Sequence, residues 1–215
     1  VICSGCPSKD LIKNENNNVN HQKELIGVGN IIDVKKKFLL VSYHPTTTQK
    51  SEIDELNINL ILKALELQKM QCIWLWPNID AGSDQISKQL RKFRETNINS
   101  DDWLTLIKNV RPEVYAWLMS NAKCLIGNSS SFVRDSGFLG TPVLLISERQ
   151  KCREHGKNVL PLGNLNSITT IKEALELQLK SDFKINDIYG KENTTETILN
   201  SLYNLEPDLQ KSFIL

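Results

Sequence analysis

The sequence predicts an α/β fold built on a doubly wound parallel sheet. Short apolar runs alternate along the chain with amphipathic stretches of helical length, and this alternation is typical of parallel βαβ units. Polar loops follow several of the apolar runs, where the carboxyl ends of the strands should lie. Ligands of doubly wound sheets bind at those strand ends, so these loops form the candidate functional site.

The predicted strands are short runs rich in aliphatic and aromatic residues. In chain order they span residues 1–8, 38–43, 72–76, 103–110, 124–127, 143–146 and 159–162. The first strand runs into a turn, because Gly5 and Pro7 both interrupt regular structure. An asparagine-rich stretch at 14–20 is typical of a tolerated surface loop.

The predicted helices show apolar residues at helical spacing or residues that favour a helix start. They span 10–13, 52–69, 84–96, 112–121, 169–180 and 194–205, and one more begins in the serines after residue 127. Ile53, Leu56 and Leu60 have the spacing of one helix face. Ser83 is the expected N-cap of the helix at 84–96. Pro112 opens the next helix, where proline is favoured.

Length and composition bound the possible functions. A chain of 215 residues can bury a sizeable core, and we assign 1–205 to one α/β domain and 206–215 to a tail. With 26 basic and 25 acidic residues the net charge is +1, so no bulk field attracts nucleic acid or an anionic membrane. No apolar run approaches the ~18 residues of a transmembrane helix. We therefore expect neither nucleic acid nor membrane as a partner.

The five cysteines indicate a reducing compartment. Their number is odd and most lie in apolar runs, so we expect them to be reduced and buried, which points to a cytoplasmic protein. Cys3 and Cys6 form a CxxC pair, but no second CxxC or histidine pair follows at zinc spacing. We therefore expect no metal.

The loop after the predicted strand at 124–127 is the strongest candidate for binding an anion. Asn128, Ser129, Ser130 and Ser131 follow Gly127 and open a helix, whose free N–H groups suit a phosphate. A helix cap alone would use one serine, so three in a row favour phosphate contact.

Two charged residues lie one helical turn beyond this loop. Asp135 could point back to hold a sugar hydroxyl, or it could simply complement the helix dipole, and the sequence leaves both open. Arg134 beside it should point to a different side and form a structural ion pair.

Other polar loops should converge on the same sheet edge. His44 follows the strand at 38–43, and Arg149 follows the strand at 143–146. Arginine supplies the two-pronged donor that suits a phosphate. Residues 77–78 end a third strand, so four loops meet where a ligand would bind.

These motifs together resemble a known family. In order along almost the whole chain lie GCPS at 5–8, HPTTT at 44–48, PNIDAGSD at 77–84, GNSSSFVRD at 127–135, GFLGTP at 137–142 and RQKCREHGKNV at 149–159. They are similar to motifs of the hydrolysing UDP-N-acetylglucosamine 2-epimerases of the sialic-acid pathway. Residues 188–190 and the tail at 209–213 look like the epimerase half of the animal bifunctional epimerase and N-acetylmannosamine kinase in particular.

The resemblance implies a fold and a reaction. The fold is the Rossmann-like, UDP-binding C-terminal half of a glycosyltransferase-B-like structure, and the N-terminal half with the proton-transferring carboxylates would lie outside this chain. UDP-GlcNAc would lose UDP by elimination, and water would add to the glucal to give N-acetylmannosamine. The family needs no metal or nicotinamide cofactor for this step. UDP-GlcNAc and UDP are the implied ligands, and the full-length protein is expected to be a homo-oligomer.

The resemblance also implies roles for individual residues. His44 would contact the diphosphate and is the candidate catalytic residue. Ser129 and Ser130 would bind phosphate oxygens, Arg149 would bind the phosphate, and Asp135 would bind the ribose hydroxyls.

The chain departs from the pattern of the family in three places, one of them a pair of residues. Asp135 stands where glutamate is usual, and Phe132 replaces a glycine, which should crowd the first helical turn near the phosphate. Ser147 and Glu148 stand where a glycine-containing pair is usual, so Glu148 should add a negative charge beside Arg149.

Three alternative functions stay open. The chain could belong to an epimerase acting on a UDP-diacetylbacillosamine-type sugar, to a glycosyltransferase-B donor domain, or to a non-catalytic nucleotide-sugar binding module. The pairing of HPTTT with PNIDAGSD argues against a transferase, because transferases have no reason to share it.

Overall fold

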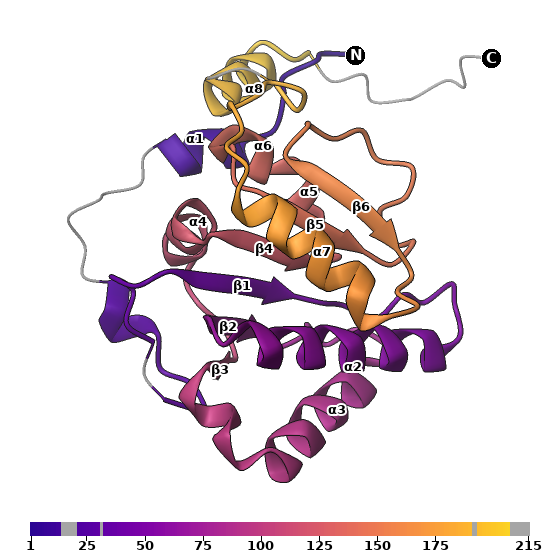
Figure 1. Ribbon diagram of the computed structural model, residues 1–215. Coiled ribbons are helices and arrows are strands. Elements are labelled where there is room, and N and C mark those ends of the chain that lie inside the picture. The colour runs from indigo at the N-terminus through magenta and orange to yellow at the C-terminus, as the bar shows by residue number, and fades with distance from the viewer. Residues whose placement is uncertain (14–20, 31, 191–192, 207–215) are drawn as a thin grey trace.

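A six-stranded parallel sheet forms the centre of the protein, as a computed structural model shows (Figure 1). The structure describes residues 1–13, 21–30, 32–190 and 193–206. The strand order is β3-β2-β1-β4-β5-β6. The strands are β1 Phe38–Ser42, β2 Gln71–Leu75, β3 Leu104–Ile107, β4 Cys124–Gly127, β5 Val143–Ile146 and β6 Val159–Gly163. This is the order of a doubly wound Rossmann-like fold, so the predicted fold class is confirmed.

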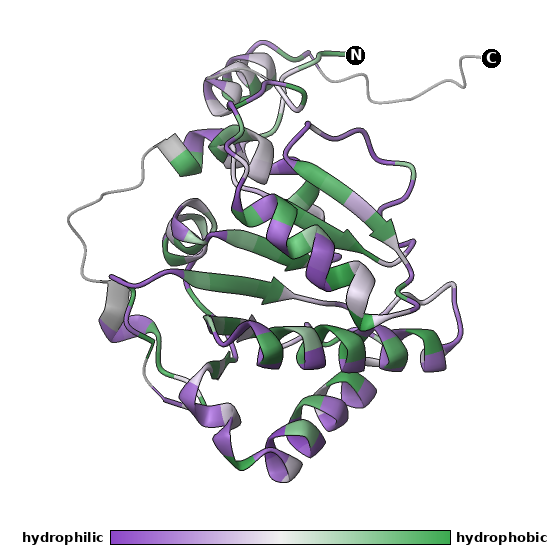
Figure 2. Cartoon of the chain, in the orientation of Figure 1, coloured by the Kyte–Doolittle hydropathy of each residue, from purple (hydrophilic) through white to green (hydrophobic). Residues whose placement is uncertain are grey.

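Helices cover both faces of the sheet. One face carries α2 Ser51–Gln68, α3 Ser83–Thr96 and α7 Ile168–Leu179, and the other carries α4 Pro112–Asn121 and α5 Ser130–Arg134 (Figure 1). Leu39 and Val41 of β1 face the first core, while Phe38 and Leu40 face the second. Because both faces are buried, β1 is apolar over nearly its whole length rather than alternating. Figure 2 shows the same division, with apolar strands inside and polar helix surfaces outside.

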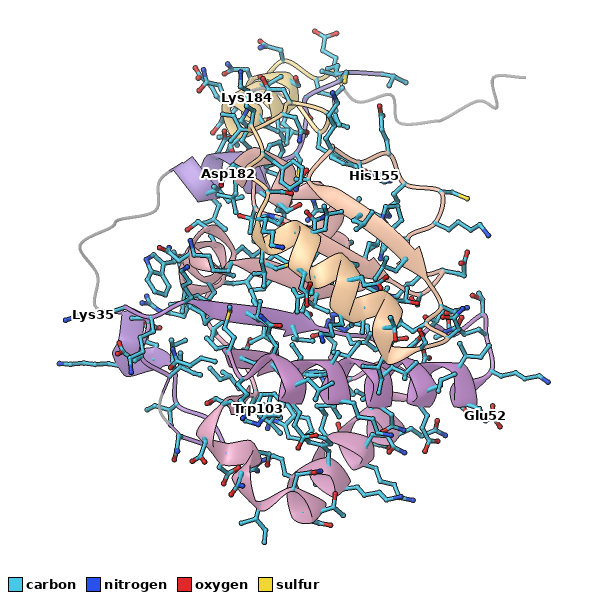
Figure 3. The ribbon with its side chains drawn as sticks, in the orientation of Figure 1. Lys35, Glu52, Trp103, His155, Asp182 and Lys184 are labelled. Atoms are coloured by element: carbon cyan, nitrogen blue, oxygen red, sulfur yellow. The ribbon has the colours of Figure 1, made fainter. Side chains whose placement is uncertain are left out.

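The remaining elements lie at the margins of the sheet. They are α1 Ser8–Lys13, η1 His21–Glu24, η2 Ile98–Asp102, α6 Ser136–Leu139 and α8 Thr194–Tyr203. The Phe93 ring of α3 meets the ring of Trp103, which follows η2, edge-on, with centroids 6.1 Å apart. Trp103 is labelled in Figure 3. This contact fastens the outer helix α3 beside β3.

The first and last described segments are joined to each other. The Asp10 carboxylate accepts hydrogen bonds from the N–H groups of Asn193 (3.1 Å) and Thr195 (2.7 Å), at the start of α8. Cys6 N donates to Tyr189 O at 2.8 Å. A side chain on Gly190 would place its Cβ 2.4 Å from Gly5 Cα, so glycine is needed at this contact.

Residues 25–30 cover the outer edge of β3. Val28 and Leu106 exchange two backbone hydrogen bonds, at 2.9 and 2.8 Å, in an isolated antiparallel bridge. A Cβ on Gly27 would lie 2.3 Å from Leu106 O, and one on Gly29 would lie 2.3 Å from Leu104 O. The two glycines therefore allow the segment to lie directly against the sheet.

The structure corrects several sequence predictions. Residues 1–8 form no strand. Gly5 has a φ of +86°, and Cys6 N donates to a carbonyl in a loop and not to a neighbouring strand of the sheet. The helix after the serines stops at Asp135 and resumes as α6; the Ser136 hydroxyl donates to Phe132 O at 2.5 Å, a bond that bends helices. Ser83 is the first residue of α3 rather than its cap, which is Gly82.

The cysteine prediction is partly wrong. All five cysteines are free, and Cys72 and Cys124 are buried in strands as expected. Cys3 and Cys152 are exposed, because the apolar pattern that favours burial belongs to the strands and not to the loops. No helix in the described part of the chain has the length and apolar character needed to cross a membrane.

Some predictions fall on residues that the structure does not describe. The asparagine-rich loop at 14–20 and residues 207–215 of the tail, including 209–213, lie outside the described ranges. The domain boundary at 205 stays a prediction.

Candidate functional site

The candidate site lies where β1 and β4 are neighbours in the sheet. Ser42 pairs with Gly127 at the ends of these two strands. Gly127 has a φ of +139°, and a Cβ there would lie 2.0 Å from Ser42 O. Only glycine permits this approach, which brings the loops that follow β1 and β4 together. The order of strands changes direction here, as at the ligand sites of doubly wound sheets.

Asn128 is the residue that ties the strand-end loops together. His44 N donates to its Oδ1 at 2.7 Å, and its Nδ2 donates to His44 O at 2.8 Å and to Ser147 Oγ at 3.1 Å. The side chain is fully buried. One amide therefore fixes the loop after β1 and the loop after β5 on the loop after β4.

The backbone carbonyl of Asn128 is also held. Arg149 Nη1 and Gln150 Nε2 both donate to it at 3.1 Å. Because N–H and C=O point in opposite directions in a trans peptide, the N–H of Ser129 points away from these two donors. The predicted phosphate ligand Arg149 thus lies in the same cluster as His44 and orients the peptide between Asn128 and Ser129.

Ser147 has a conformation that is unusual for a residue other than glycine. Its φ is +69°, in the left-handed region. Its buried hydroxyl accepts from Asn128 Nδ2, Arg149 N (3.3 Å) and Thr46 Oγ1 (3.4 Å). Glycine would adopt this backbone conformation more easily, but it would lack the hydroxyl that makes these hydrogen bonds.

His44 is buried, and its surroundings lower its pKa. Its Nε2 lies 3.2 Å from Ser42 Oγ, whereas its buried Nδ1 has no hydrogen-bond partner in the described structure and lies 3.9 Å from Asp80 Oδ2. Burial lowers the pKa of His44, the Arg149 charge lowers it further, and Asp80 acts in the opposite direction. The imidazole is therefore neutral at neutral pH, with one ring nitrogen unused.

His44 and Ser129 line one cavity of about 320 Å³. Trp76, Leu75 and Val110 add apolar walls, and the cavity also has polar groups from the loop after β3 and from α4. The polar lining includes Ser42, Lys108, Tyr115 and Ser131. A cavity with an apolar wall and a few convergent polar groups suits a small polar ligand with a planar ring.

The other predicted site residues, Ser130, Asp135 and Arg149, are not part of the lining of this cavity. Ser130 is the half-buried first residue of α5. Asp135 is buried and accepts from Arg134 Nε at 2.8 Å and Nη2 at 3.3 Å. The predicted ion pair of Arg134 is therefore confirmed, but the expectation that Arg134 points to a different side from Asp135 is wrong, because Asp135 is its partner. The role of Asp135 toward a sugar stays a prediction.

The expected crowding by Phe132 is wrong. Its side chain is fully buried in the core on the α4 side of the sheet. The charge of Glu148 is compensated, since Glu148 Oε2 forms an ion pair with Lys151 Nζ at 2.8 Å. Neither departure from the family pattern disturbs the cavity.

Sequence reasoning assigned no individual role to four residues of the site. Asn128 and Ser147 each directly follow a strand, and that position could have identified them. Ser131 was seen only as part of a serine run. Tyr115 lies on α4, and no local pattern marks it. The described residues contain no cluster of side chains suited to a metal ion.

Comparison with known proteins gives consistent matches. The family model described as UDP-N-acetylglucosamine 2-epimerase matches residues 1–203. A UDP-N-acetylglucosamine 2-epimerase of Neisseria meningitidis is 28% identical over 180 residues, covering 80% of this chain and 45% of that protein. A GDP/UDP-N,N'-diacetylbacillosamine 2-epimerase (hydrolyzing) of Campylobacter jejuni is 30% identical over 152 residues, covering 70% of this chain and 38% of that protein.

Solved structures show the same fold. The UDP-GlcNAc 2-epimerase of Methanocaldococcus jannaschii, in complex with UDP-GlcNAc and UDP, is similar with a TM-score of 0.66 at 16% identity, covering 93% of this chain and 54% of that one. The Neisseria meningitidis enzyme bound to UDP-GlcNAc gives a TM-score of 0.65 at 16% identity, covering 95% and 56%. The chain thus spans about half the length of the proteins it matches.

Proposed function

Because the chain belongs to the UDP-N-acetylglucosamine 2-epimerase family, we propose that it supplies the UDP-binding half of a hydrolysing enzyme. In the proposed reaction a base removes the proton from C2 of UDP-GlcNAc, the C1–O bond breaks, and its electrons leave with UDP. Water then adds across the C1–C2 double bond of the glucal and gives N-acetylmannosamine, a precursor for sialic-acid synthesis. The enzyme would act in the cytoplasm, as a homo-oligomer when full length.

The observation that carries this proposal is the convergence of three strand-end loops on Asn128. Through this convergence His44 and Ser129 line one cavity. Arg149 is held in the same cluster by its hydrogen bond to the backbone carbonyl of Asn128. Negative charge grows on the diphosphate as the C1–O bond breaks. Donors that are already fixed stabilise this charge more in the transition state than in the ground state.

We assign each site residue a role on this basis. His44 is the candidate catalytic residue, since its ring can donate a hydrogen bond to the departing diphosphate. Ser129, Ser130 and Arg149 bind phosphate oxygens, and Asp135 binds the ribose hydroxyls. The apolar wall of Trp76 and Val110 suits the uracil ring.

The groups that move the proton at C2 belong, in this proposal, to the other half of the enzyme. The relatives carry about as much sequence again as this chain matches. We expect the chain alone to bind UDP and not to turn over UDP-GlcNAc. In a protein that carries both halves, UDP and N-acetylmannosamine should appear together from UDP-GlcNAc and water. Release of UDP that requires an acceptor sugar would contradict the proposal and favour a glycosyltransferase.

Titration calorimetry of this chain with UDP tests the site. Arg149→Ala and Ser129→Ala should each weaken binding, Arg149→Ala by about tenfold or more because its hydrogen bond to phosphate is charge-assisted. Lys88→Ala is the matched control, since it removes an exposed positive charge on α3. Unchanged affinity in both site variants would show that the assignment is wrong.

A second substrate is favoured by one comparison. The Campylobacter jejuni relative is described as acting on N,N'-diacetylbacillosamine nucleotides. The two sugar classes differ in groups that the other half would contact, so this chain cannot distinguish them. The ratio of kcat/KM for UDP-GlcNAc and UDP-diacetylbacillosamine, measured on the enzyme with both halves, decides between them.

A further inference from the structure

Three hydroxyl groups form a continuous chain at the wall of the cavity. Tyr115 Oη lies 2.5 Å from Ser131 Oγ, and Ser131 Oγ lies 2.8 Å from Ser129 Oγ. Tyr115 comes from α4, whereas both serines come from the loop and first turn after β4. All three residues line the same cavity.

The hydroxyl of Ser129 is not used for helix capping. Ser129 is the N-cap residue of α5, yet its side chain makes no capping hydrogen bond. It is buried at the cavity wall, with an exposed fraction of 8%. Its oxygen is therefore engaged with Ser131, and the direction of that bond decides whether its proton is free.

The chain of hydroxyls can run in two directions, because each group has one proton. If Ser129 donates to Ser131, its proton is used and it can only accept from a ligand. If Tyr115 donates to Ser131 and Ser131 donates to Ser129, the proton of Ser129 is left for the ligand. Phosphate oxygens of a nucleoside diphosphate are acceptors at neutral pH, so only the second direction suits them.

The chemistry of the three groups favours this second direction. A phenol is more acidic than an aliphatic alcohol and is the better donor. Burial of Tyr115 raises its pKa to about 12, so the phenol keeps its proton at neutral pH. Hydrogen bonds in a row polarise one another, which strengthens the donor at the end of the chain.

We propose that Tyr115 is a positioning residue of the phosphate site: it donates to Ser131, Ser131 donates to Ser129, and Ser129 then presents its proton to a phosphate oxygen of a nucleoside diphosphate. This inference rests on the proposed function for the identity of the ligand. It assigns Tyr115 and Ser131 a role that acts through Ser129 and requires no contact between Tyr115 and the ligand.

The test compares ligands with and without phosphate. Tyr115→Phe removes only the hydroxyl and should weaken UDP binding by about three- to tenfold, the effect of one hydrogen bond. Uridine lacks phosphate, so its affinity, measured by NMR titration, should not change. Ser131→Ala should reproduce both results. Tyr203→Phe is the matched control, because Tyr203 is an exposed tyrosine on α8 and its variant should bind both ligands normally.

A double-mutant cycle identifies Ser129 as the group through which Tyr115 acts. In the Ser129→Ala background, Tyr115→Phe should cause no further loss of UDP affinity. Losses that multiply in the double variant would overturn the proposal. Equal losses for UDP and uridine would also overturn it, since they would show that Tyr115 contacts the base or supports the cavity as a whole.

Inorganic pyrophosphate separates this inference from the proposed function. If the unaltered chain binds pyrophosphate but does not prefer UDP over ADP, the proposed function fails. The inference still holds in that case if Tyr115→Phe weakens pyrophosphate binding only when Ser129 is present. A chain that binds neither UDP nor pyrophosphate contradicts both.

Discussion

Ser147 combines a backbone conformation that favours glycine with a hydroxyl that the site uses. Among the described residues other than glycine, only Lys69, Ser147 and Asn193 have positive φ. Lys69 ends helix α2, where a left-handed residue is common, and asparagine tolerates this region. Ser147 has neither reason, but its hydroxyl accepts hydrogen bonds from Thr46 after β1, from Asn128 after β4 and from Arg149 N in its own loop.

Two substitutions at Ser147 separate the hydroxyl from the backbone. Ser147→Ala loses the hydroxyl and keeps the strain, so we expect the free energy of unfolding to fall by about 1–3 kcal/mol. Ser147→Gly loses the same hydroxyl but relaxes the backbone, and should recover about 1 kcal/mol of that loss. Urea denaturation of both variants measures the difference. A glycine variant less stable than the alanine variant would show that φ at this position is not strained.

The lowered pKa of His44 gives a pH dependence with a defined sign. The folded protein holds the imidazole neutral, so the unfolded chain binds more protons below its ordinary pKa of about 6.5. The stability contributed by His44 is therefore complete above about pH 6.5. It is lost as the pH falls toward the lowered pKa of the folded state.

Urea denaturation over this pH range checks the prediction. His44→Gln should flatten the fall in stability below about pH 6.5. His155→Gln is the matched control, because it removes a histidine from the loop between β5 and β6 (Figure 3). If stability falls just as steeply with decreasing pH in His44→Gln, the pH dependence comes from other titratable groups.

Helix α8 depends on a residue far from it in sequence. Its N-cap, Asn193, makes no side-chain capping bond, and the carboxylate of Asp10 bonds to two N–H groups at the helix start instead. The pKa of Asp10 is lowered, chiefly by its hydrogen bonds from Thr195. A negative charge at this position also complements the helix dipole.

Removing the charge of Asp10 should therefore loosen α8. In Asp10→Asn the amides of α8 should exchange with deuterium faster, while those of α2 keep their protection. In the unaltered chain the same loosening should appear only under acid, as the pH falls from about 3.9 through the lowered pKa of Asp10. Asp182→Asn is the control, since Asp182 is an exposed acid after α7 (Figure 3). Equal exchange rates of the α8 amides in Asp10→Asn and Asp182→Asn would show that Asp10 does not stabilise α8.

The sequence predicted most elements because burial on both faces makes strands apolar and helices amphipathic. The strand β1 and the helix α2 were found within one or two residues by this pattern. The break at Asp135 was not found, since it accompanies a side-chain bond from Ser136 to Phe132. The segment at 1–8 was misjudged because its apolar start resembles a strand, although its partners lie in a loop near the other end of the chain.

Part of the site could be predicted, because residues that directly follow parallel strands meet at the same edge of the sheet. His44, Ser129 and Arg149 each follow a strand, so the βαβ pattern alone brings them to one edge. Tyr115 could not be found in this way, because it belongs to the first turn of α4 and not to a loop that directly follows a strand. Its role depends on a distance of 2.5 Å to Ser131, which no sequence pattern expresses.

At the scale of the whole molecule, the stability of the fold is sensitive to substitution of Gly27 and Gly29 at the edge of β3. Gly29 has a φ of +117°, and a side chain there would meet Leu104 O. Gly29→Val should displace residues 25–30 and lower the free energy of unfolding by about 2–4 kcal/mol, since it adds both strain and a clash. Ile26→Val changes an exposed apolar residue in the same segment and should have little effect. Thermal unfolding compares the two; similar transition temperatures would contradict the prediction.

The covered edge has a consequence for behaviour at high concentration. An exposed strand edge is a template on which strands of other copies can add, and repeated addition builds fibrils. In this chain, residues 25–30 meet β3 through one antiparallel bridge, so their direction interrupts the parallel ladder. Strand addition at this edge would first have to remove them. The short segment would thus keep this edge of the sheet from polymerising, at the cost of two positions that admit only glycine.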